Sequence, residues 1–279
     1  MKETIRELIT EIEEEYDIVV LFAVESGSRA WGMSSEDSDY DIRFVFKRPL
    51  DAYISLKKNK DVIIASYDKD SLKVPAKGCV FDFQGFDIHK YLGMMLKSNP
   101  SCIEWLKSDI VYTHLGMREK LLEWMLKNVQ SKKLFYHYKS MCGQNYIKYL
   151  KSEKLVTYKK YLYAMRGLVN ALWVKKYNTI PPIDFNDTLN ASHDLLPINI
   201  ILKVKEIIRL KQEGKEKDII ENIVAIDNFI ESFLKEEEDK IFKGEGDVFF
   251  YSECIEIEAE EWKKLDIYLR GEIIHHEGE

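Results

Sequence analysis

The sequence lacks several features that mark common classes of protein. Its 279 residues contain no apolar run near the roughly 20 residues that a membrane-spanning helix needs. Residues 1–17 (MKETIRELITEIEEEYD) have no apolar core of a secretory signal peptide. The cysteines lie far apart, with no CxxC pair and no Cys/His spacing typical of metal ligands, at Cys79, Cys102, Cys142 and Cys254. We therefore expect a cytoplasmic protein with reduced thiols and no zinc site.

Internal repeats and low-complexity segments are also missing. Hydrophobic residues make up 46% of the chain, which is ample for a core and excludes disorder for most of its length. Because 279 residues exceed one typical domain, we expect either one large domain or two of modest size.

Acidic residues outnumber basic ones by 48 to 41, and the resulting net charge of −7 by itself argues against a nucleic-acid partner. The charges are unevenly distributed along the chain. Residues 118–180 hold 14 Lys and Arg against 3 Asp and Glu, a net charge of +11. Residues 235–279 hold 6 against 15, a net charge of −9. The net charge of the whole chain therefore conceals a basic block (118–180) and an acidic tail (235–279). The basic block favours a phosphate-bearing partner.

The periodicity of apolar residues changes near residue 115. Before it, the patterns predict strands at 17–24, 40–46, 62–65 and 80–88 and helices at 2–15, 52–57, 89–97 and 103–106. After it, they predict only helices, at 118–129, 132–152, 157–177, 199–213, 218–241 and 256–270. We expect an α/β (α+β) fold, in which a first domain with a mixed β-sheet (1–117) precedes an α-helical domain (118–279).

Two aspartates at the start of the predicted strand 40–46 are the first candidates for chemistry. Asp39 and Asp41 are two positions apart, so both carboxylates point to the same face of a strand. Two like charges held together are costly unless a cation compensates them, and oxygen-only ligands suit Mg²⁺. A third carboxylate from a neighbouring strand, for which Asp87 is a candidate, would complete a two-metal clamp for phosphoryl displacement.

The turn that precedes these aspartates fits the same chemistry. Gly27 lets the backbone approach a ligand closely, and exposed N–H groups with the Ser28 hydroxyl can hold a phosphate. If a helix begins here, the phosphates would lie near Arg29 at its N-terminus. A turn of this kind before a strand with an Asp-x-Asp pair predicts a metal-dependent phosphoryl or nucleotidyl transfer site.

Residues 25–43 (ESGSRAWGMSSEDSDYDIR) resemble the signature of the DNA polymerase β-like nucleotidyltransferase superfamily. Within that superfamily the chain is most similar to the nucleotidyltransferases linked with RNA repair, the RlaP-type family. Three later segments also resemble that family, so the resemblance covers roughly residues 20–182: residues 84–90, 99–106 and 158–166. It implies a polymerase β-like head and transfer of a nucleotide from an NTP to an acceptor hydroxyl, with release of pyrophosphate.

The resemblance also implies roles for individual residues. Gly27 and Ser28 would hold the triphosphate, while Asp39 and Asp41 would ligate two Mg²⁺ ions, with Mn²⁺ as an alternative. Asp87 would ligate the catalytic metal and help to deprotonate the acceptor hydroxyl.

Asp82 competes with Asp87 for the third position. The two are five residues apart, which places them on opposite faces of a regular strand, although a bulge at Gly85 would reset the parity. The resemblance, not the spacing, favours Asp87. Members of the family often have an arginine two residues after this carboxylate. Because His89 occupies that position here, the resemblance implies no substrate contact at it.

Basic and aromatic residues alternate in residues 132–177, a pattern that suits phosphates and stacked bases. Within this segment, Lys160 and Arg166 are the candidates for contacts to the triphosphate or the base. Together with Arg29 and Ser38 near the Asp-x-Asp pair, they complete the expected nucleotide-binding set. The basic block favours an RNA or another nucleic-acid end as the acceptor. Nucleotidylation of a small molecule or a protein remains open, as does a non-catalytic, antitoxin-like binding module of the same fold.

Overall fold

A computed structural model of the chain describes residues 1–56, 58–153, 155–242, 263–267 and 270–271. The strands are β1 (Val19–Glu25), β2 (Tyr40–Lys47), β3 (Val62–Tyr67), β4 (Phe81–Asp87), β5 (Val111–His114), β6 (Leu155–Thr157) and β7 (Ile219–Glu221). The first helices are α1 (Lys2–Tyr16), α2 (Gly27–Ala30), α3 (Leu50–Ile54), α4 (Ile88–Met95), α5 (Pro100–Lys107) and α6 (Met117–Asn128). The later ones are α7 (Ser131–Tyr146), α8 (Tyr158–Tyr177), α9 (Phe185–Asn190), α10 (Ile198–Leu210) and α11 (Val224–Phe242), with π-helical turns at Ile147–Lys151 and Lys211–Lys215.

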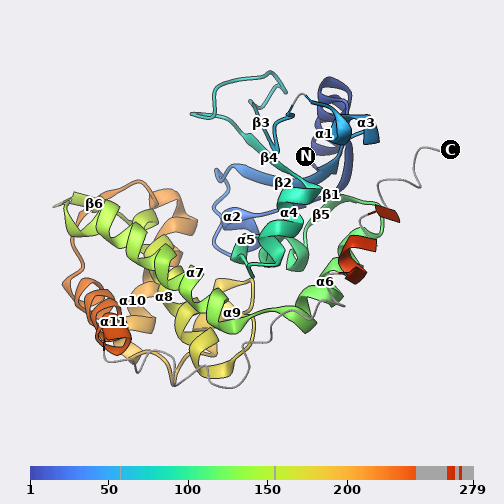
Figure 1. Cartoon of the computed structure of the whole chain (residues 1–279). Coiled ribbons are helices and arrows are strands. Elements are labelled where there is room, and N and C mark those ends of the chain that lie inside the picture. Colours follow the sequence, from blue (N-terminus) through green and yellow to red (C-terminus); the bar gives the residue numbers. More distant parts are fainter. Residues whose placement is uncertain (57, 154, 243–262, 268–269, 272–279) are drawn as a thin grey trace.

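The first five strands form one mixed sheet in the order β3-β4-β2-β1-β5 (Figure 1). Strands β2 and β4 are parallel, and the other neighbouring pairs are antiparallel. Because the sheet is mixed and lies in the first part of the chain, the expected α/β head followed by helices is confirmed. A separate two-stranded ribbon, β6 with β7, lies at one end of the helical part.

Helix α1 covers one face of the sheet. Its apolar residues recur at helical spacing and are at most 4% exposed, as the sequence pattern predicts: Ile5, Leu8, Ile9 and Ile12. They pack in one cluster with side chains of the sheet such as Ile42 and Phe44. The opposite face therefore remains for the helices that follow β4.

That opposite face belongs to a core that extends into the helical part of the chain. Val45 and Phe86 from the sheet, Trp105 from α5 and Leu168 from α8 belong to the same buried cluster. Within the described ranges, no helix is long and apolar enough to cross a membrane. Helix α4 thus packs against β2 and β4 and α6 against β1, while α5 links this layer to the long helix α7.

Helices α7 and α8 make the most extensive contact between two elements of the described chain. A Cβ atom at Gly167 would lie 2.7 Å from the backbone nitrogen of Cys142 and 3.0 Å from the carbonyl oxygen of Tyr138. Glycine is therefore required for the two helix backbones to approach this closely.

Four short elements were not expected from the sequence. The second part contains strands β6 and β7, although only helices are predicted there, and β7 occupies the start of the predicted helix 218–241. Strand β5 and helix α9 lie in segments without a predicted element. Each of the three strands has only three or four residues, which is too short for a reliable alternation of apolar and polar positions. Most of the predicted helix 256–270 and of the acidic tail lies outside the described residues.

Candidate active site

The turn after β1 is shaped around a carboxylate. Gly27 has φ of +62°, a conformation that glycine adopts without strain, and a Cβ atom there would lie 1.9 Å from Asp41 Oδ2. The backbone nitrogen of Ser26 donates to the carbonyl oxygen of Asp41 at 2.8 Å, which fixes the turn to β2. The predicted phosphate-binding pair Gly27 and Ser28 therefore begins α2 directly beside Asp41.

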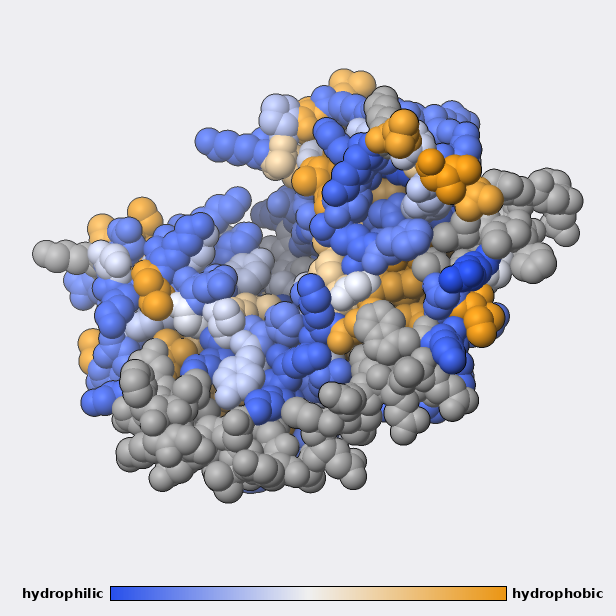
Figure 2. Space-filling view, in the orientation of Figure 1, coloured by the Kyte–Doolittle hydropathy of each residue, from blue (hydrophilic) through white to orange (hydrophobic). Residues whose placement is uncertain are grey.

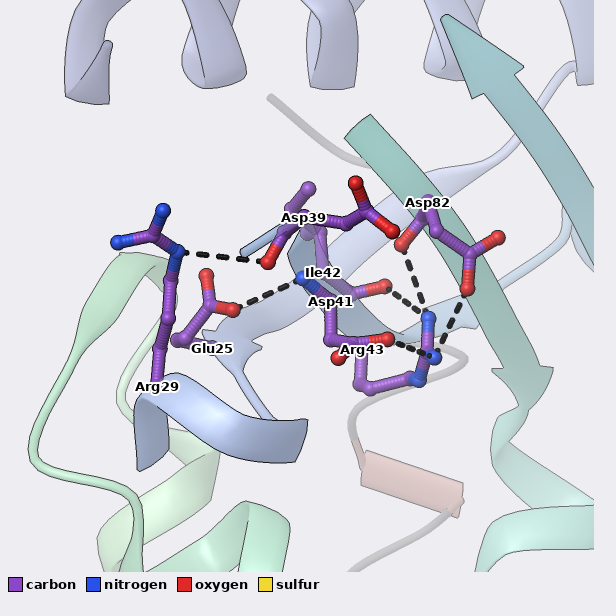
Figure 3. Close-up of polar contacts among 7 residues, drawn as sticks. All are labelled: Glu25, Arg29, Asp39, Asp41, Ile42, Arg43 and Asp82. Atoms are coloured by element: carbon purple, nitrogen blue, oxygen red, sulfur yellow. Dashed lines mark hydrogen bonds and ion pairs between the residues drawn. The ribbon is translucent and has the colours of Figure 1, made fainter. Parts of the chain in front are cut away.

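Three aspartates lie close together at the start of β2 and β4 (Figure 3). The parallel register pairs Asp41 with Asp82, so these carboxylates come from adjacent positions on neighbouring strands. Arg43 Nη2 donates to Asp41 Oδ1 at 2.8 Å and to Asp82 Oδ2 at 2.9 Å, bridging the two. Asp39 lies just before β2 and interacts electrostatically with both Asp41 and Asp82. The structure thus confirms the predicted proximity of Asp39 and Asp41 and adds Asp82 to the group.

Asp87 lies elsewhere, so its predicted place beside Asp39 and Asp41 is wrong. The β2–β4 register runs without interruption to the pair Phe46–Asp87, which excludes a bulge at Gly85. Asp87 is consequently about 16 Å along the strand from Asp82 and points to the opposite face. It caps α4 by accepting from the backbone nitrogen of His89 at 2.9 Å, and Tyr53 Oη donates to it at 3.0 Å.

Burial raises the pKa of two aspartates near the turn. It raises the pKa of Asp41, an effect that Arg43 opposes and that the neighbouring Asp82 and Asp39 reinforce. Burial likewise raises the pKa of Asp39, although the positive charges of Lys159 and Lys217 act in the other direction. These acids would be stabilised in their ionised form by an added cation.

Glu25 at the end of β1 is a fully buried carboxyl group that the sequence did not single out. Its Oε1 accepts from the backbone nitrogen of Asp41 at 2.8 Å, and the Tyr112 hydroxyl donates to its Oε2. Burial raises the pKa of Glu25 to about 7. Glu25 thus holds the backbone of Asp41 from the protein interior.

The three aspartates have the donor chemistry that a hard divalent cation prefers. Asp39, Asp41 and Asp82 offer only oxygen atoms, the ligands that Mg²⁺ prefers. In the described part of the chain, no three acidic, histidine or cysteine side chains are gathered around one metal-sized position. The Arg43 guanidinium lies between Asp41 and Asp82 and supplies the positive charge that balances them. A cation bound by these carboxylates would take over that role from Arg43.

Two predicted nucleotide-binding residues brace the loop that carries Asp39. Arg29 Nη2 donates to the carbonyl oxygen of Ser38 at 2.6 Å, and its guanidinium lies 3.9 Å from the centroid of the Tyr40 ring. The Ser38 hydroxyl accepts from the backbone nitrogen of Ser35 at 2.9 Å. These contacts of Arg29 and Ser38 therefore fix the conformation of the loop that precedes the Asp-x-Asp pair.

Lys159, rather than the predicted Lys160, lies toward the aspartates. Lys159 interacts electrostatically with Asp39 and forms an ion pair with Glu216 at 3.4 Å. It lines a narrow gap with Ser28 and Lys211. Lys160, one position on along α8, places its ammonium 5.4 Å from the centroid of the Tyr149 ring.

Arg166 is buried in an ion pair and does not extend into solvent. Its Nη1 donates to Glu104 Oε1 at 2.8 Å, and its guanidinium lies 3.6 Å from the centroid of the Trp31 ring. Trp31 Nε1 donates to the other oxygen of Glu104 at 3.0 Å. Because Trp31 directly follows α2, this cluster ties α5 and α8 to the Gly27–Ser28 turn.

Sequence signals for the missed residues differ in strength. Strand parity indicates only that Asp82 and Asp87 lie on opposite faces of a regular β4, and the register of β2 on β4 decides that Asp82 shares the face of Asp41. Lys159 lies on the same stripe of α8 as Tyr163 and Arg166, at spacings of four and three residues. Glu25 and Glu104 carry no such signal, because only the tertiary fold shows that they are buried.

Comparison with known proteins identifies the family. The family described as RNA repair pathway DNA polymerase beta family (RlaP) matches residues 1–270. The chain belongs to this family. The predicted resemblance is thereby confirmed, and the chain is of the nucleotidyltransferase type.

Individual proteins are also similar to this member of the RlaP family. YcgL, an uncharacterized protein of Bacillus subtilis (strain 168), is 34% identical over 236 residues, which cover 84% of this chain and 86% of YcgL. Spectinomycin adenyltransferase AAD(9) from Enterococcus faecialis, solved with ATP and spectinomycin, is 13% identical, with a TM-score of 0.46 over 84% of this chain and 97% of that chain. A nucleotidyltransferase-like protein from Exiguobacterium sibiricum 255-15 is 10% identical, with a TM-score of 0.33 over 99% of this chain and 90% of that chain.

Proposed function

We propose that this protein transfers a nucleoside monophosphate from an NTP to the hydroxyl of an RNA or another nucleic-acid end. The acceptor oxygen forms a bond to the α-phosphorus, the bond from that phosphorus to the bridging oxygen of pyrophosphate breaks, and the hydroxyl proton is released. Two Mg²⁺ ions, for which Mn²⁺ can substitute, would polarise the phosphate oxygens and lower the pKa of the acceptor hydroxyl.

The observation that supports this proposal most directly is the pairing of Asp41 with Asp82 on adjacent strands beside the Gly27–Ser28 turn, with Asp39 near both of them. The three carboxylates would hold the ions. Asp41 and Asp82 come from the adjacent strands β2 and β4, so the sheet itself sets their spacing, and Asp39 precedes β2. Asp82 would take the third position, for which the family resemblance favours Asp87.

The remaining polar groups suit the binding of a triphosphate. Ser28 lines the narrow gap described above together with Lys159 and Lys211. Both lysines form ion pairs with Glu216, which position their ammonium groups. Gly27 brings the turn close to Asp41, and Arg29 keeps the loop with Asp39 in place. These residues would orient the α-phosphorus toward the acceptor.

The choice of a nucleic-acid acceptor rests on the family's description and on the basic block. In that block Lys148 and Lys160 place their ammonium groups 4.9 and 5.4 Å from the centroid of one ring, that of Tyr149. An aromatic ring beside two cations offers both a stacking surface and phosphate-neutralising charge.

A transfer assay tests both the proposed activity and the assignment of Asp82 as the third metal-binding carboxylate. Each labelled NTP is incubated with Mg²⁺ and a mixed-sequence RNA oligomer, and pyrophosphate release and label incorporation are measured. We expect Asp41→Asn and Asp82→Asn to lose roughly 100-fold or more of the activity, because each removes a carboxylate that would hold the Mg²⁺ ions, and these ions would stabilise the negative charge of the transition state.

Asp87→Asn is the matched control, since asparagine can keep the cap of α4 and lies at the other end of the same strand. It is expected to retain activity, with thermal unfolding showing that all three variants are folded. Full activity of Asp82→Asn would reject the assignment of Asp82. Absence of pyrophosphate release with RNA, small hydroxyl compounds and protein acceptors alike would reject the transferase.

A further inference from the structure

A cavity of about 380 Å³ lies where the two parallel strands of the sheet end. Strand β2 leads into α3 and β4 leads into α4, and the lining comes from the chain around α3 (48–61) together with Asp87 and His89. In α/β sheets, ligands often bind outside the carboxyl ends of parallel strands. The volume also falls in the range of roughly 300–1,000 Å³ that is typical of small-ligand sites.

This cavity is separate from the proposed transfer site. Asp41 and Asp82 lie at the start of β2 and β4, whereas Arg48 and Asp87 lie at the other end of the same strands. The space-filling view shows a hollow between the sheet-bearing and helical parts (Figure 2), and α3 lies on the side of the head away from the helical part (Figure 1). A ligand in the cavity would therefore leave the aspartates accessible.

Three cations of the lining lack a carboxylate partner. In the part of the chain that the structure describes, Arg48, Lys58 and Lys60 form no ion pair. Arg48 is half-buried, and its guanidinium donates to the carbonyl oxygens of Tyr16 at 3.2 Å and of Lys60 at 3.1 Å. These two bonds hold the guanidinium in place without neutralising its charge.

The two carboxylates of the lining are already engaged. Asp61 accepts from the ammonium of Lys90 at 2.9 Å, and it also attracts Lys58, although these two form no ion pair. Asp87 is 6% exposed and accepts from the Tyr53 hydroxyl at 3.0 Å. The three cations of the lining and Lys90 thus supply four positive charges against two negative ones, which favours an anion in the cavity.

His89 adds an imidazole that is held on two sides. Its Nδ1 lies 3.4 Å from Asp87 Oδ1, and its ring centroid lies 4.8 Å from that of Tyr53. The side chain is half exposed, and Nε2 has no hydrogen-bond partner among the residues whose positions are described. When the imidazole is protonated, Nε2 is a hydrogen-bond donor that an anion can use.

We propose that this cavity binds the phosphate group of a phosphomonoester. A phosphate dianion offers only acceptor oxygens near neutral pH, and the Arg48, Lys58 and Lys60 side chains offer only donors. Charge-assisted hydrogen bonds of this kind are the strong ones in proteins. A free small molecule and the 5′ end of an RNA can both present such a phosphate. The inference goes beyond the proposed function and does not depend on it.

Two matched double variants test the charge of the lining. Lys58→Ser with Lys60→Ser removes two cations of the cavity, and Lys69→Ser with Lys77→Ser removes two exposed lysines between β3 and β4 of the same head. Calorimetric titration with inorganic phosphate, at constant ionic strength and without divalent cations, measures the affinity. We expect saturable binding by the wild type, weakened roughly fivefold or more in the cavity variant and unchanged in the control.

A second measurement locates the bound phosphate and does not rely on the double variant being folded. Phosphate should shift the NMR resonances of the His89 ring, identified by their loss in His89→Phe, and leave those of the exposed His193 unchanged. Lys159→Ser alters the separate gap at Ser28 and should leave the His89 shift intact. A His89 signal that ignores phosphate, or no saturable binding by the wild type, overturns the proposal.

Two further ligands distinguish the source of the phosphate. Ribose 5-phosphate represents a free phosphomonoester, and an RNA oligomer with a 5′-phosphate is compared with the same oligomer ending in a hydroxyl. If the cavity variant abolishes the preference for the phosphorylated RNA, the cavity takes an RNA end. If it weakens only ribose 5-phosphate, the cavity takes a small molecule. Unchanged affinity for both ligands in the folded cavity variant rejects the site.

These measurements are separate from turnover. Asp41→Asn should bind phosphate in the cavity as the wild type does, because Asp41 lies at the other end of β2. A wild type that shifts the His89 signal with phosphate but releases no pyrophosphate retains the cavity site and loses the transferase. An active enzyme whose His89 signal ignores phosphate retains the transferase and loses the cavity site.

Discussion

At Gly27 the backbone turns with φ of +62°, and a methyl group there would lie 1.9 Å from Asp41 Oδ2. The residue thus has two separate requirements, one conformational and one steric. Gly78 shares the first, with φ of +88°, but no atom lies within 4 Å of the Cβ position there. Substitutions at Gly27 and Gly78 can therefore be compared to separate the effect of backbone strain from the effect of displacing the Asp41 carboxylate.

We predict that Gly27→Ala and Gly78→Ala each destabilise the fold by about 1–2 kcal/mol, because alanine is strained at positive φ. Only Gly27→Ala should also reduce pyrophosphate release and Mg²⁺ affinity, since its methyl group pushes Asp41 aside. Thermal unfolding and the transfer assay measure the two effects. Equal activity of both variants would show that the position of Asp41 tolerates the displacement.

Glu25 gives the fold a pH dependence that can be assigned to one residue. Its pKa in the folded protein is raised to about 7 from an ordinary value of 4.5, so between these pH values the folded state holds a proton that the unfolded chain releases. Raising the pH through this window therefore destabilises the fold. We predict that the melting temperature of the wild type falls more between about pH 5 and about pH 8 than that of Glu25→Gln, measured without divalent cations. Parallel melting curves for the two proteins would contradict the raised pKa.

At the scale of elements, α7 and α8 illustrate how the same substitution can have opposite effects. Both Gly143 and Gly167 lie inside helices, where glycine is less favourable than alanine. At Gly143 a Cβ atom would make an ordinary contact of 3.6 Å with Leu234, whereas at Gly167 it would meet the backbone of α7 at 2.7 Å.

We predict that Gly143→Ala stabilises the protein by roughly 0.5–1 kcal/mol through helix propensity. Gly167→Ala should destabilise it by about 1–3 kcal/mol, because the helix backbones must move apart. Urea-induced unfolding gives both values. If both variants were stabilised, the close approach of α7 and α8 would not be a constraint.

At the scale of the whole molecule, the net charge of −7 conceals a basic block of +11 in residues 118–180. We predict that RNA binding weakens with added salt, and that Lys148→Ser with Lys160→Ser reduces the slope of log K against log [salt] by about 1.4, because each neutralised phosphate of a single strand accounts for about 0.7. The matched control replaces Lys203 and Lys235, two exposed lysines outside the block. An equal change in slope for both double variants would mean that binding follows total charge, not the block.

The sequence predicts the architecture of this protein better than the details of its site. Apolar periodicity locates α1, and the Asp-x-Asp spacing correctly places Asp39 and Asp41 together. The choice between Asp82 and Asp87 requires the register of β2 on β4, which is a contact between segments 41 residues apart. Likewise, the burial of Glu25, Glu104 and Arg166 depends on side chains from distant elements, which no local pattern records.

The parallel pairing of β2 with β4 has a consequence for how this protein can diverge. Asp41 and Asp82 are held opposite each other by the hydrogen bonds of the ladder, while the chain between the two strands passes through α3 and the edge strand β3. Insertions or deletions in the loops that flank α3 and β3 leave the ladder, and hence the separation of the two carboxylates, unchanged. This excursion is therefore the part of the head where relatives can gain or lose sequence while keeping the same chemistry.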